Sequence, residues 1–213
     1  MIVNEATRQS MALDAFVTAG HHQQRVYGLQ WGIPEEAPQL RRAKDEFVLP
    51  ALNSEMTVIE IGCGGGRWSR YFRERVEKAY LVDATQAAEA AVRAHCDWAG
   101  FEFVVASDGR MPSIETATVD YAFSFDTFVH FHRELFDTYI SEVSRILKPG
   151  ALFHLLHAKR WPDSIVNEQI FQYRDDDDVS ALLASGSFRL TNRSLEFRVG
   201  FGSILREAVR LLR

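Results

Sequence analysis

Hydrophobic positions follow two different spacings along the central part of the chain. Short continuous apolar runs, typical of strands buried on both faces, cover residues 57–61, 79–82, 101–106, 120–125 and 151–156. Between these runs, apolar residues recur at intervals of three and four, which is the spacing of amphipathic helices. Because strand and helix patterns alternate, the sequence predicts right-handed crossovers and a mainly parallel sheet.

The most strongly patterned helix is predicted over residues 133–147 and stops at Lys148-Pro149-Gly150. The other predicted helices cover residues 4–20, 38–49, a stretch that begins at Arg67, a stretch from a Thr85 cap to about His95, and residues 179–184. Four consecutive acids at 175–178 precede the last of these. We expect them to form a solvated helix cap rather than a cation site, because consecutive side chains cannot all point inward.

The C-terminal third has weaker patterns. Residues 188–199 alternate in part between apolar and polar side chains, which predicts an antiparallel β-hairpin. Residues 204–213 follow a basic amphipathic pattern and predict a helix. We expect this helix to pack on the domain or on a sister subunit of a homodimer rather than on a membrane surface.

Charge and composition narrow the classes of function. A net charge of -5 and an isoelectric point near 5.8 give no electrostatic reason to expect nucleic acid, so a small-molecule substrate is expected instead. The sequence has neither a run of eighteen apolar residues nor a secretory signal pattern, which predicts a cytoplasmic protein without a membrane span. Cys63 and Cys96 have no metal or disulfide spacing, so we expect two free thiols.

A glycine-rich loop follows the first predicted strand. Its sequence, from Glu60 to Gly66, reads E-x-G-x-G-x-G, whereas the dinucleotide-binding array G-x-G-x-x-G would need its third glycine at Arg67. Residues without Cβ let a ligand approach the backbone closely. A helix that begins at Arg67 would add free N–H groups. The loop therefore indicates a site for a nucleotide-like ligand other than a dinucleotide.

Acidic residues stand at the ends of several predicted strands. Asp83 lies 21 residues beyond Gly62, where a βαβ unit places the end of its second strand and where a carboxylate can accept hydrogen bonds from ribose hydroxyls. Glu60, Asp108 and Asp126 stand at the ends of three other strands. The carboxyl ends of parallel strands share one edge of the sheet, so we expect Glu60, Asp83 and Asp108 to lie around one ligand.

Four motifs in order, over residues 55–157, resemble class I S-adenosylmethionine-dependent methyltransferases. They are the E-x-G-x-G-x-G loop, the acid at 83, the Ser107-Asp108-Gly109 turn, and the run from Asp120 to Phe125 followed by Leu147-Lys148-Pro149-Gly150-Ala151-Leu152. The resemblance implies an α/β, Rossmann-like three-layer sandwich with a mainly parallel seven-stranded type of sheet. It also implies one domain, 1–213, with a helical cap at 1–50, a cofactor-binding core at 51–160 and a substrate-side, sheet-closing segment at 161–213.

The same resemblance implies the ligand and its contacts. The cofactor would be S-adenosylmethionine, leaving S-adenosylhomocysteine as product. Asp108 would reach the adenine amino group, and Gly109 would leave room for the ring. The expected cofactor-binding residues are Glu60, Gly62, Cys63, Gly64, Asp83, Ala84, Asp108, Gly109 and Phe125.

A sulfonium methyl group is already activated, so the enzyme has to align the acceptor and manage its proton. For a hydroxyl acceptor, histidine is a suitable base. His130, ten residues beyond Asp120, occupies a loop in which related O-methyltransferases often carry a catalytic histidine, and is the predicted base. In a strand, His154 and His157 would point to opposite faces. The expected substrate-binding residues are Tyr27, Trp31, Asp126 and His157, although Tyr27 and Trp31 equally fit a cover for the sheet edge.

Metal dependence is not expected. In metal-dependent relatives, acids after the fourth and fifth strands hold Mg²⁺, and Asp126 fits the first of these positions. The fifth strand, however, is followed by His157-Ala158-Lys159-Arg160, which lacks the expected Asp or Asn. Asp126 is therefore expected to orient His130 or to contact the substrate.

Three functions remain open from the sequence. The favoured one is O-methylation of a sugar or natural product, because the Trp31-Gly32 cap and the stretch 123–130 resemble bacterial enzymes of polysaccharide and secondary-metabolite pathways. An N-methyltransferase acting on a small amine would not need His130. A cofactor-binding partner subunit without catalysis would use the predicted C-terminal helix for docking.

Overall fold

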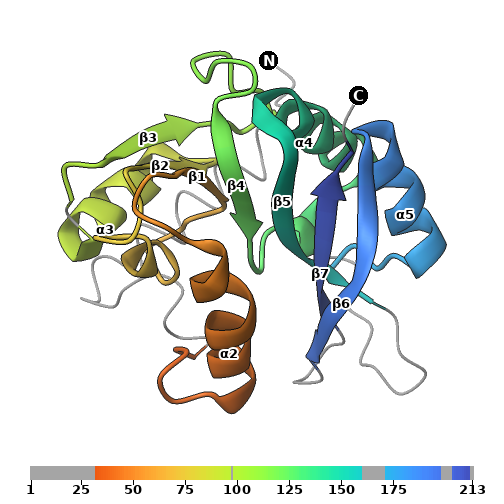
Figure 1. Cartoon of the computed structure of the whole chain (residues 1–213), viewed down its shortest axis with the longest axis horizontal. Helices are drawn as coiled ribbons and strands as arrows, with labels where there is room; N and C mark the ends of the chain where they lie inside the picture. Colours follow the sequence, from red (N-terminus) through yellow and green to blue (C-terminus); the bar gives the residue numbers. More distant parts are fainter. Residues whose placement is uncertain (1–31, 97, 160–170, 198–202, 212–213) are drawn as a thin grey trace, which may run out of the picture.

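In a computed structural model of the chain, which describes residues 32–96, 98–159, 171–197 and 203–211, seven strands form one sheet in the order β3-β2-β1-β4-β5-β7-β6 (Figure 1). The first five strands in the chain run parallel to one another, and β7 pairs antiparallel with both β5 and β6. This confirms the mainly parallel, seven-stranded sheet. The strands are β1 Thr57–Ile61, β2 Lys78–Asp83, β3 Phe101–Val105, β4 Val119–Ser124, β5 Leu147–Ala158, β6 Phe188–Phe197 and β7 Ser203–Arg210.

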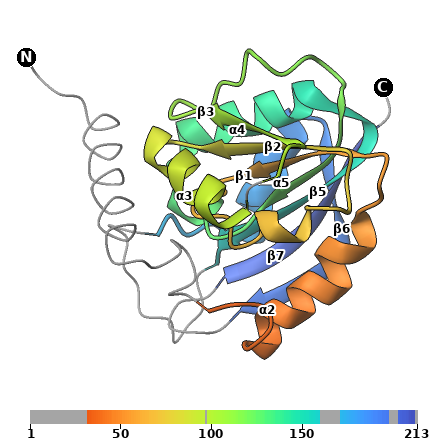
Figure 2. The same cartoon turned by 90° about the vertical axis from the view of Figure 1, so that its left-hand side faces the viewer.

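Helices cover both faces of the sheet (Figures 1 and 2). On one face lie α3 (Gln86–Cys96) and a continuous helical stretch made of α2 (Pro38–Arg42), the π-helix η2 (Ala43–Val48) and the 3₁₀ turn η3 (Leu49–Ala51). On the other face lie α4 (Arg133–Ile146) and α5 (Asp176–Ser185). These layers confirm the expected three-layer sandwich. The predicted helix 4–20, Tyr27 and Trp31 lie outside the described residues.

Two hydrophobic cores result from the alternation of side chains along the strands. On β1, Val58 belongs to the core under η2 and α3, whereas Ile59 and Ile61 belong to the core under α4 and α5. Because both faces of β1 are covered, the strand is apolar on both. The carboxyl ends of β1 to β5 are thereby held at one edge of the sheet, where α/β proteins bind ligands.

The helix predicted from Arg67 is wrong. The segment forms turns and one short 3₁₀ helix, η4 (Ser69–Tyr71), and Glu74 adopts a positive φ of 63°. Trp68 and Phe72 are nevertheless buried, because both pack edge-on against Phe123 of β4. Their helical spacing therefore reports burial by tertiary contacts rather than a regular helix.

The predicted C-terminal helix is also wrong. Residues 203–210 form β7, which is hydrogen-bonded between β5 and β6. The hairpin expected within 188–199 supplies only its first strand, β6, and β7 is the second. A strand that is buried on both faces carries adjacent apolar residues such as Ile204 and Leu205, and in a short segment this pattern is hard to distinguish from that of a helix.

Candidate functional site

The glycine-rich loop is hydrogen-bonded to the end of β2. The N–H groups of Gly62 and Cys63 donate to the carbonyl of Val82 at 2.7 and 3.0 Å. Asp83 continues this contact, because its Oδ2 accepts the N–H of Gly64 at 3.0 Å. Gly62 and Gly64 have φ values of 77° and 52°, a region that glycine enters without strain. The first two strands therefore position the loop jointly.

The second oxygen of Asp83 accepts the N–H of Thr85 at 3.3 Å, so Asp83 braces the turn that leads into α3. The hydroxyl of Thr85, the expected cap of that helix, is buried and has no hydrogen-bond partner among the described residues. Thr85 is therefore not the N-cap that its position suggested. Thr85 follows Asp83, the residue expected to bind ribose, by two positions in the chain.

Glu60 lies behind the loop. Only 2% of its surface is exposed, and Ser69 Oγ donates to its Oε2 at 2.5 Å. Burial raises the pKa of Glu60 to about 8, and the negative charge of Asp83 acts in the same direction. Glu60 therefore carries a proton for most of the time at neutral pH.

Two of the glycines accommodate side chains of the protein itself. A Cβ on Gly62 would lie 1.8 Å from Thr127 Oγ1, and a Cβ on Gly66 would lie 2.6 Å from Cys96 Sγ. The thiol of Cys96 donates to the carbonyl of Gly66 at 3.3 Å. Both cysteines are buried free thiols, as expected. Thr127 thus packs the loop after β4 onto the glycine-rich loop.

The turn after β3 contacts α4. Asp108 is exposed, and its carboxylate lies 3.8 Å from Nε of Arg110. Gly109 has a φ of 82°, and a Cβ there would lie 3.1 Å from the ring of Tyr139, so the side of the glycine on which a side chain would stand faces α4. Burial raises the pKa of Tyr139, and the charges of Asp83 and Asp108 add to this. Both carboxylates therefore act on the same side chain of α4.

The loop after β4 is tied to the glycine-rich loop by an ion pair. Asp126, with a positive φ of 60°, pairs with Arg67, which is buried. The Arg67 guanidinium also lies 5.5 Å from the ring of Phe125. Phe125 packs at 4.7 Å on Trp68, within the core. Asp126 is thus bound to Arg67, a partner that the sequence did not single out, rather than to His130.

His130 ends a short 3₁₀ helix, η5 (Phe128–His130), and is exposed. Its ring stacks on Phe171, with centroids 5.3 Å apart. His132, two residues on, caps α4, since its Nδ1 accepts the N–H of Leu135 at 3.3 Å. Both histidines are exposed, and His130 is distinguished from His132 by its aromatic partner.

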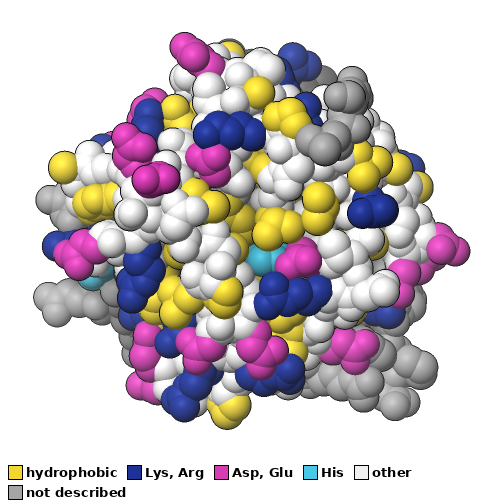
Figure 3. Space-filling model, viewed as in Figure 1, with side chains coloured by type: hydrophobic (Ala, Val, Ile, Leu, Met, Phe, Trp, Pro, Cys, Tyr) yellow, Lys and Arg dark blue, Asp and Glu magenta, His cyan; other side chains and the backbone are white. Residues whose placement is uncertain are grey.

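His154 and His157 are buried on opposite faces of β5, as their odd spacing predicted. The Tyr121 hydroxyl donates to Nδ1 of His154 at 2.9 Å, and its Nε2–H donates to Glu207 of β7 at 2.9 Å. Burial lowers the pKa of His157 to about 4, and its Nε2 has no hydrogen-bond partner in the part of the chain that the structure describes. In the centre of the face seen in Figure 3, a histidine lies beside an acid and a base among hydrophobic side chains.

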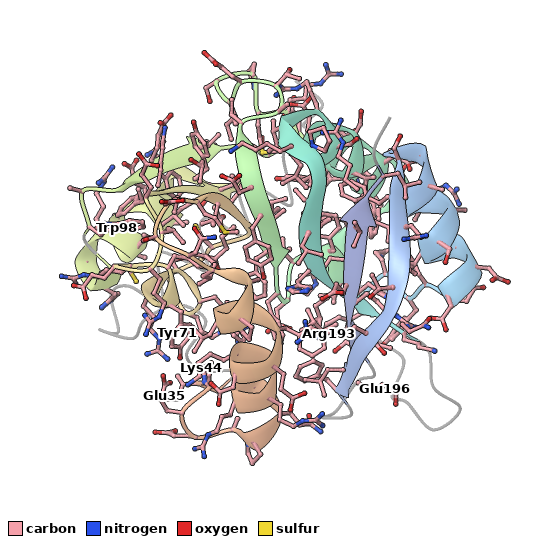
Figure 4. All side chains as sticks on the ribbon, viewed as in Figure 1. Glu35, Lys44, Tyr71, Trp98, Arg193 and Glu196 are labelled. Atoms are coloured by element: carbon pink, nitrogen blue, oxygen red, sulfur yellow. The ribbon has the colours of Figure 1, made fainter. Side chains whose placement is uncertain are left out.

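The described end of the expected cap is tied to η4. The Tyr71 hydroxyl donates to Glu35 at 2.6 Å, and Arg70 donates to the same carboxylate at 2.7 Å. Lys44 lies 5.6 Å above the Tyr71 ring. Figure 4 shows Glu35, Lys44 and Tyr71 together beside α2. Residues 33–37 are thus anchored next to the glycine-rich segment.

The acids at 175–178 act as expected. Asp175 caps α5, with its Oδ1 accepting the N–H of Asp178 at 2.7 Å. Across the described ranges, no three His, Cys, Asp or Glu side chains gather as a metal site would require. None of the helices in the described residues is both long and apolar enough to span a membrane.

Comparison with known proteins supports the same family. A family model described as a methyltransferase domain matches residues 58–150. No protein with a curated description matches the sequence. The family model begins in β1 and ends at Gly150 within β5, so it contains the glycine-rich loop, Asp83, Asp108 and His130.

Solved structures share the fold at low sequence identity. The 1,6-didemethyltoxoflavin-N1-methyltransferase of Burkholderia thailandensis, with bound 1,6-didemethyltoxoflavin and S-adenosylhomocysteine, is 16% identical, with a TM-score of 0.71 over 100% of this chain and 93% of that one. A SAM-dependent methyltransferase from Methanosarcina mazei is 19% identical, with a TM-score of 0.61 over 77% and 96%. The [4+2]-cyclase SpnF is 14% identical, with a TM-score of 0.66 over 82% of both chains.

These likenesses show the fold, and the family model covers the segment that carries the motifs. The cyclase among the neighbours means that the fold alone does not fix the reaction. The chain therefore has the Rossmann-like fold of these methyltransferase structures, and its residues 58–150, which hold the E-x-G-x-G-x-G loop joined to Asp83 at the carboxyl ends of β1 and β2, are similar to a methyltransferase domain.

Proposed function

We propose that the protein transfers the methyl group of S-adenosylmethionine to a hydroxyl group of a small molecule, a sugar or another natural product, with His130 as general base. The observation that carries the proposal is the position of His130. It is exposed, and it follows by three residues Thr127, which packs on Gly62 of the cofactor loop. His154 and His157, by contrast, are buried and out of reach of an acceptor.

The residues present fit the cofactor that this proposal needs. Asp83 at the end of β2 and Asp108 after β3 supply carboxylate acceptors, and the buried hydroxyl of Thr85 lacks a partner within the described ranges. Asp83 would hold the ribose and Asp108 the adenine. When bound, the cofactor supplies an electrophilic methyl group. The remaining residues proposed to line its site are Glu60, Gly62, Cys63, Gly64, Ala84, Gly109 and Phe125.

The residues of the protein itself have to align the acceptor and remove its proton. His130 would take that proton as the oxygen attacks, and the stacked Phe171 ring limits the orientations of the imidazole. Asp126 and His157, which were expected to bind the substrate, are proposed to shape its site without touching the acceptor, because Asp126 pairs with Arg67 and His157 is buried. We place the reaction in the cytoplasm, in polysaccharide or natural-product biosynthesis, with residues 1–213 acting as one domain.

A mass-shift screen tests the proposal. The protein is incubated with S-adenosylmethionine and sets of sugars, phenols and amines, and each product is scored for the gain of one methyl group. His130→Ala should lower the turnover of hydroxyl acceptors by about 10²-fold or more, with little change in cofactor affinity by calorimetry. His95→Ala, at an exposed histidine in the last turn of α3, is the matched control and should leave both values unchanged.

N-methylation is the second candidate. The Burkholderia thailandensis neighbour is named for methylation at N1 of a small heterocycle. An amine loses its proton more readily than a hydroxyl, so this function predicts methylated amines in the screen and normal turnover by His130→Ala. The partner-subunit alternative has lost its support, because the helix expected to dock is the internal strand β7.

A further inference from the structure

We propose that Arg174 is a positioning residue on the side of the site where the acceptor would bind. Its side chain holds the loop of His130 and the segment of Phe171 in a fixed position relative to each other. The inference rests on the proposed function, because it gives His130 an acceptor to deprotonate. Arg174 precedes α5 and was not singled out by any sequence motif.

The Arg174 guanidinium bridges two segments. Its Nη2 donates to the carbonyl of Phe131 at 2.7 Å, directly after His130, and its Nη1 donates to the carbonyl of Gln172 at 3.0 Å, directly after Phe171. A planar guanidinium offers these donors in a fixed geometry, which a flexible ammonium group does not. One side chain therefore fixes the backbone next to both rings.

Arg174 is itself held rigidly. Only 7% of its surface is exposed, its guanidinium lies 4.8 Å from the Phe136 ring, and its Nε lies 3.7 Å from Asp178 Oδ2. A buried cation is costly unless it is paired and hydrogen-bonded. These contacts come from α4 and α5, so the two helices set the place of the guanidinium.

Backbone hydrogen bonds complete the arrangement. The Arg174 N–H donates to Ala158 at the end of β5 at 3.0 Å, and the Gln172 N–H donates to Val129 of η5 at 2.7 Å. Residues 171–174 thus run between the ends of β4 and β5, and Phe171 meets His130 there. Most of the residues proposed to bind the cofactor lie at or just after the ends of β1, β2 and β3, so an acceptor would approach from the side of β4 and β5.

This arrangement bears on the rate because a general base acts only within hydrogen-bond reach of the proton. A displacement of about 1 Å can cost about 10²-fold in rate. His130 is exposed, so its own burial does not fix it. The structure supplies the constraint through Phe171 and through the two carbonyls bound by Arg174.

The chain offers a matched control. Arg133 also pairs with Asp178, at 3.0 Å, but its side chain is 63% exposed and it touches neither bridged carbonyl. Arg174→Met removes the guanidinium and keeps an apolar side chain. Arg133→Met removes only the other basic partner of Asp178. Arg174→Lys keeps the charge without the guanidinium and serves if the Met variant does not fold.

The first test is hydrogen exchange, which needs no substrate. We expect exchange in residues 128–132 and 171–173 to rise about tenfold in Arg174→Met, with the strands unchanged and with wild-type exchange in Arg133→Met. Unchanged exchange in both segments, or an equal rise in Arg133→Met, would overturn the proposal.

The second test uses the acceptor found in the screen. Arg174→Met should lower kcat at least tenfold with cofactor Kd within twofold, and should have no further effect when His130 is already Gln. Fully additive losses would contradict positioning through His130. If His130→Gln alone has normal turnover, the base assignment fails while the exchange experiment still decides the role of Arg174.

Discussion

Asp83 Oδ2 lies 3.0 Å from the backbone nitrogen of Gly64, so the carboxylate proposed to bind ribose also holds the loop beneath it. The two functions are coupled because loss of the side chain removes a cofactor partner and frees the loop. Asp83→Ala should therefore weaken S-adenosylmethionine binding by roughly 1.5 to 3 kcal/mol, the range for a lost charged hydrogen bond. Calorimetric titration measures this directly.

Glu89→Ala is the control for Asp83→Ala, since Glu89 is a surface acid on α3 paired with Arg93 at 2.7 Å. Its affinity for the cofactor should equal that of the wild type. NAD⁺ titrated into the same wild-type protein should give no heat of binding, in keeping with the spacing of the loop glycines. Normal S-adenosylmethionine affinity in Asp83→Ala would remove Asp83 from the cofactor site.

Glu60 gives the protein a stability that falls as pH rises. Its folded pKa of about 8 exceeds the ordinary 4.5, so the folded state binds more protons than the unfolded state between these values. The free energy of unfolding should therefore decrease from pH 4.5 to 8, by an amount on the order of a few kcal/mol. Glu60→Gln, which mimics the neutral acid, should flatten this slope in urea titrations.

An exposed acid provides the control for this pH dependence of the free energy of unfolding. Glu115→Gln changes an exposed residue and should preserve the wild-type dependence on pH. The difference between the two variants isolates Glu60 from the buried histidines, which act at lower pH. A slope that is the same in Glu60→Gln and wild type would mean that Glu60 is ionised in the folded protein.

For the pair of His154 and Glu207, we expect the free energy of unfolding to decrease as the pH falls, which is the opposite of the trend due to Glu60. Burial lowers the pKa of His154 from 6.5, so the stability due to neutral His154 is lost as pH falls below 6.5. Glu207 opposes that shift and also accepts hydrogen bonds from Thr191 and Arg193. Glu207→Leu should cost about 1 to 3 kcal/mol at pH 7 by leaving these donors unpaired, and should deepen the loss in acid.

The control for Glu207→Leu is Glu196→Leu, at an exposed position of β6. Arg193, seen in Figure 4 near α2, lies 4.4 Å from the Phe47 ring of η2, so the network also joins the sheet to that helix. Equal stability of the two Leu variants at pH 7 would show that the network contributes nothing net.

Local pattern was enough for the strands that make the site. The run from Thr57 to Ile61 is apolar because both faces of β1 are buried, and the glycines that end it have the positive φ that their position requires. The placement of Asp83 followed from the usual length of the connection between two parallel strands, and Asp83 does end β2, although the connection contains a 3₁₀ turn instead of an α-helix. These features depend on residues close in sequence.

Contacts between distant residues were not predictable from the same patterns. Arg67 and Asp126 are 59 positions apart, and Arg174 reaches a carbonyl 43 positions away. The segment 203–210 has an apolar pattern that fits a helix, and only pairing with β5 and β6 makes it a strand. Register and partner choice are tertiary properties, and a single sequence carries little record of them.

The Arg67 and Asp126 pair predicts unequal effects for its two members. Arg67 is 6% exposed at the side chain and Asp126 30%, so loss of the carboxylate strands a buried cation, whereas loss of the guanidinium leaves an acid that water can reach. Asp126→Asn should cost roughly 3 kcal/mol of stability and Arg67→Met roughly 1 kcal/mol. Asparagine tolerates the positive φ at 126, so backbone strain does not confuse the comparison.

Urea unfolding of both single variants and of the double variant measures the asymmetry and the coupling. Glu89→Gln, which breaks an exposed pair on α3, should cost less than about 0.5 kcal/mol and sets the scale for a surface contact. Equal losses from Asp126→Asn and Arg67→Met would mean that the guanidinium reaches water, and the ion pair would then no longer explain how the loop after β4 is held against the cofactor loop. Unequal losses with strong coupling would show that the buried Arg67 guanidinium holds the loop after β4 against the cofactor loop.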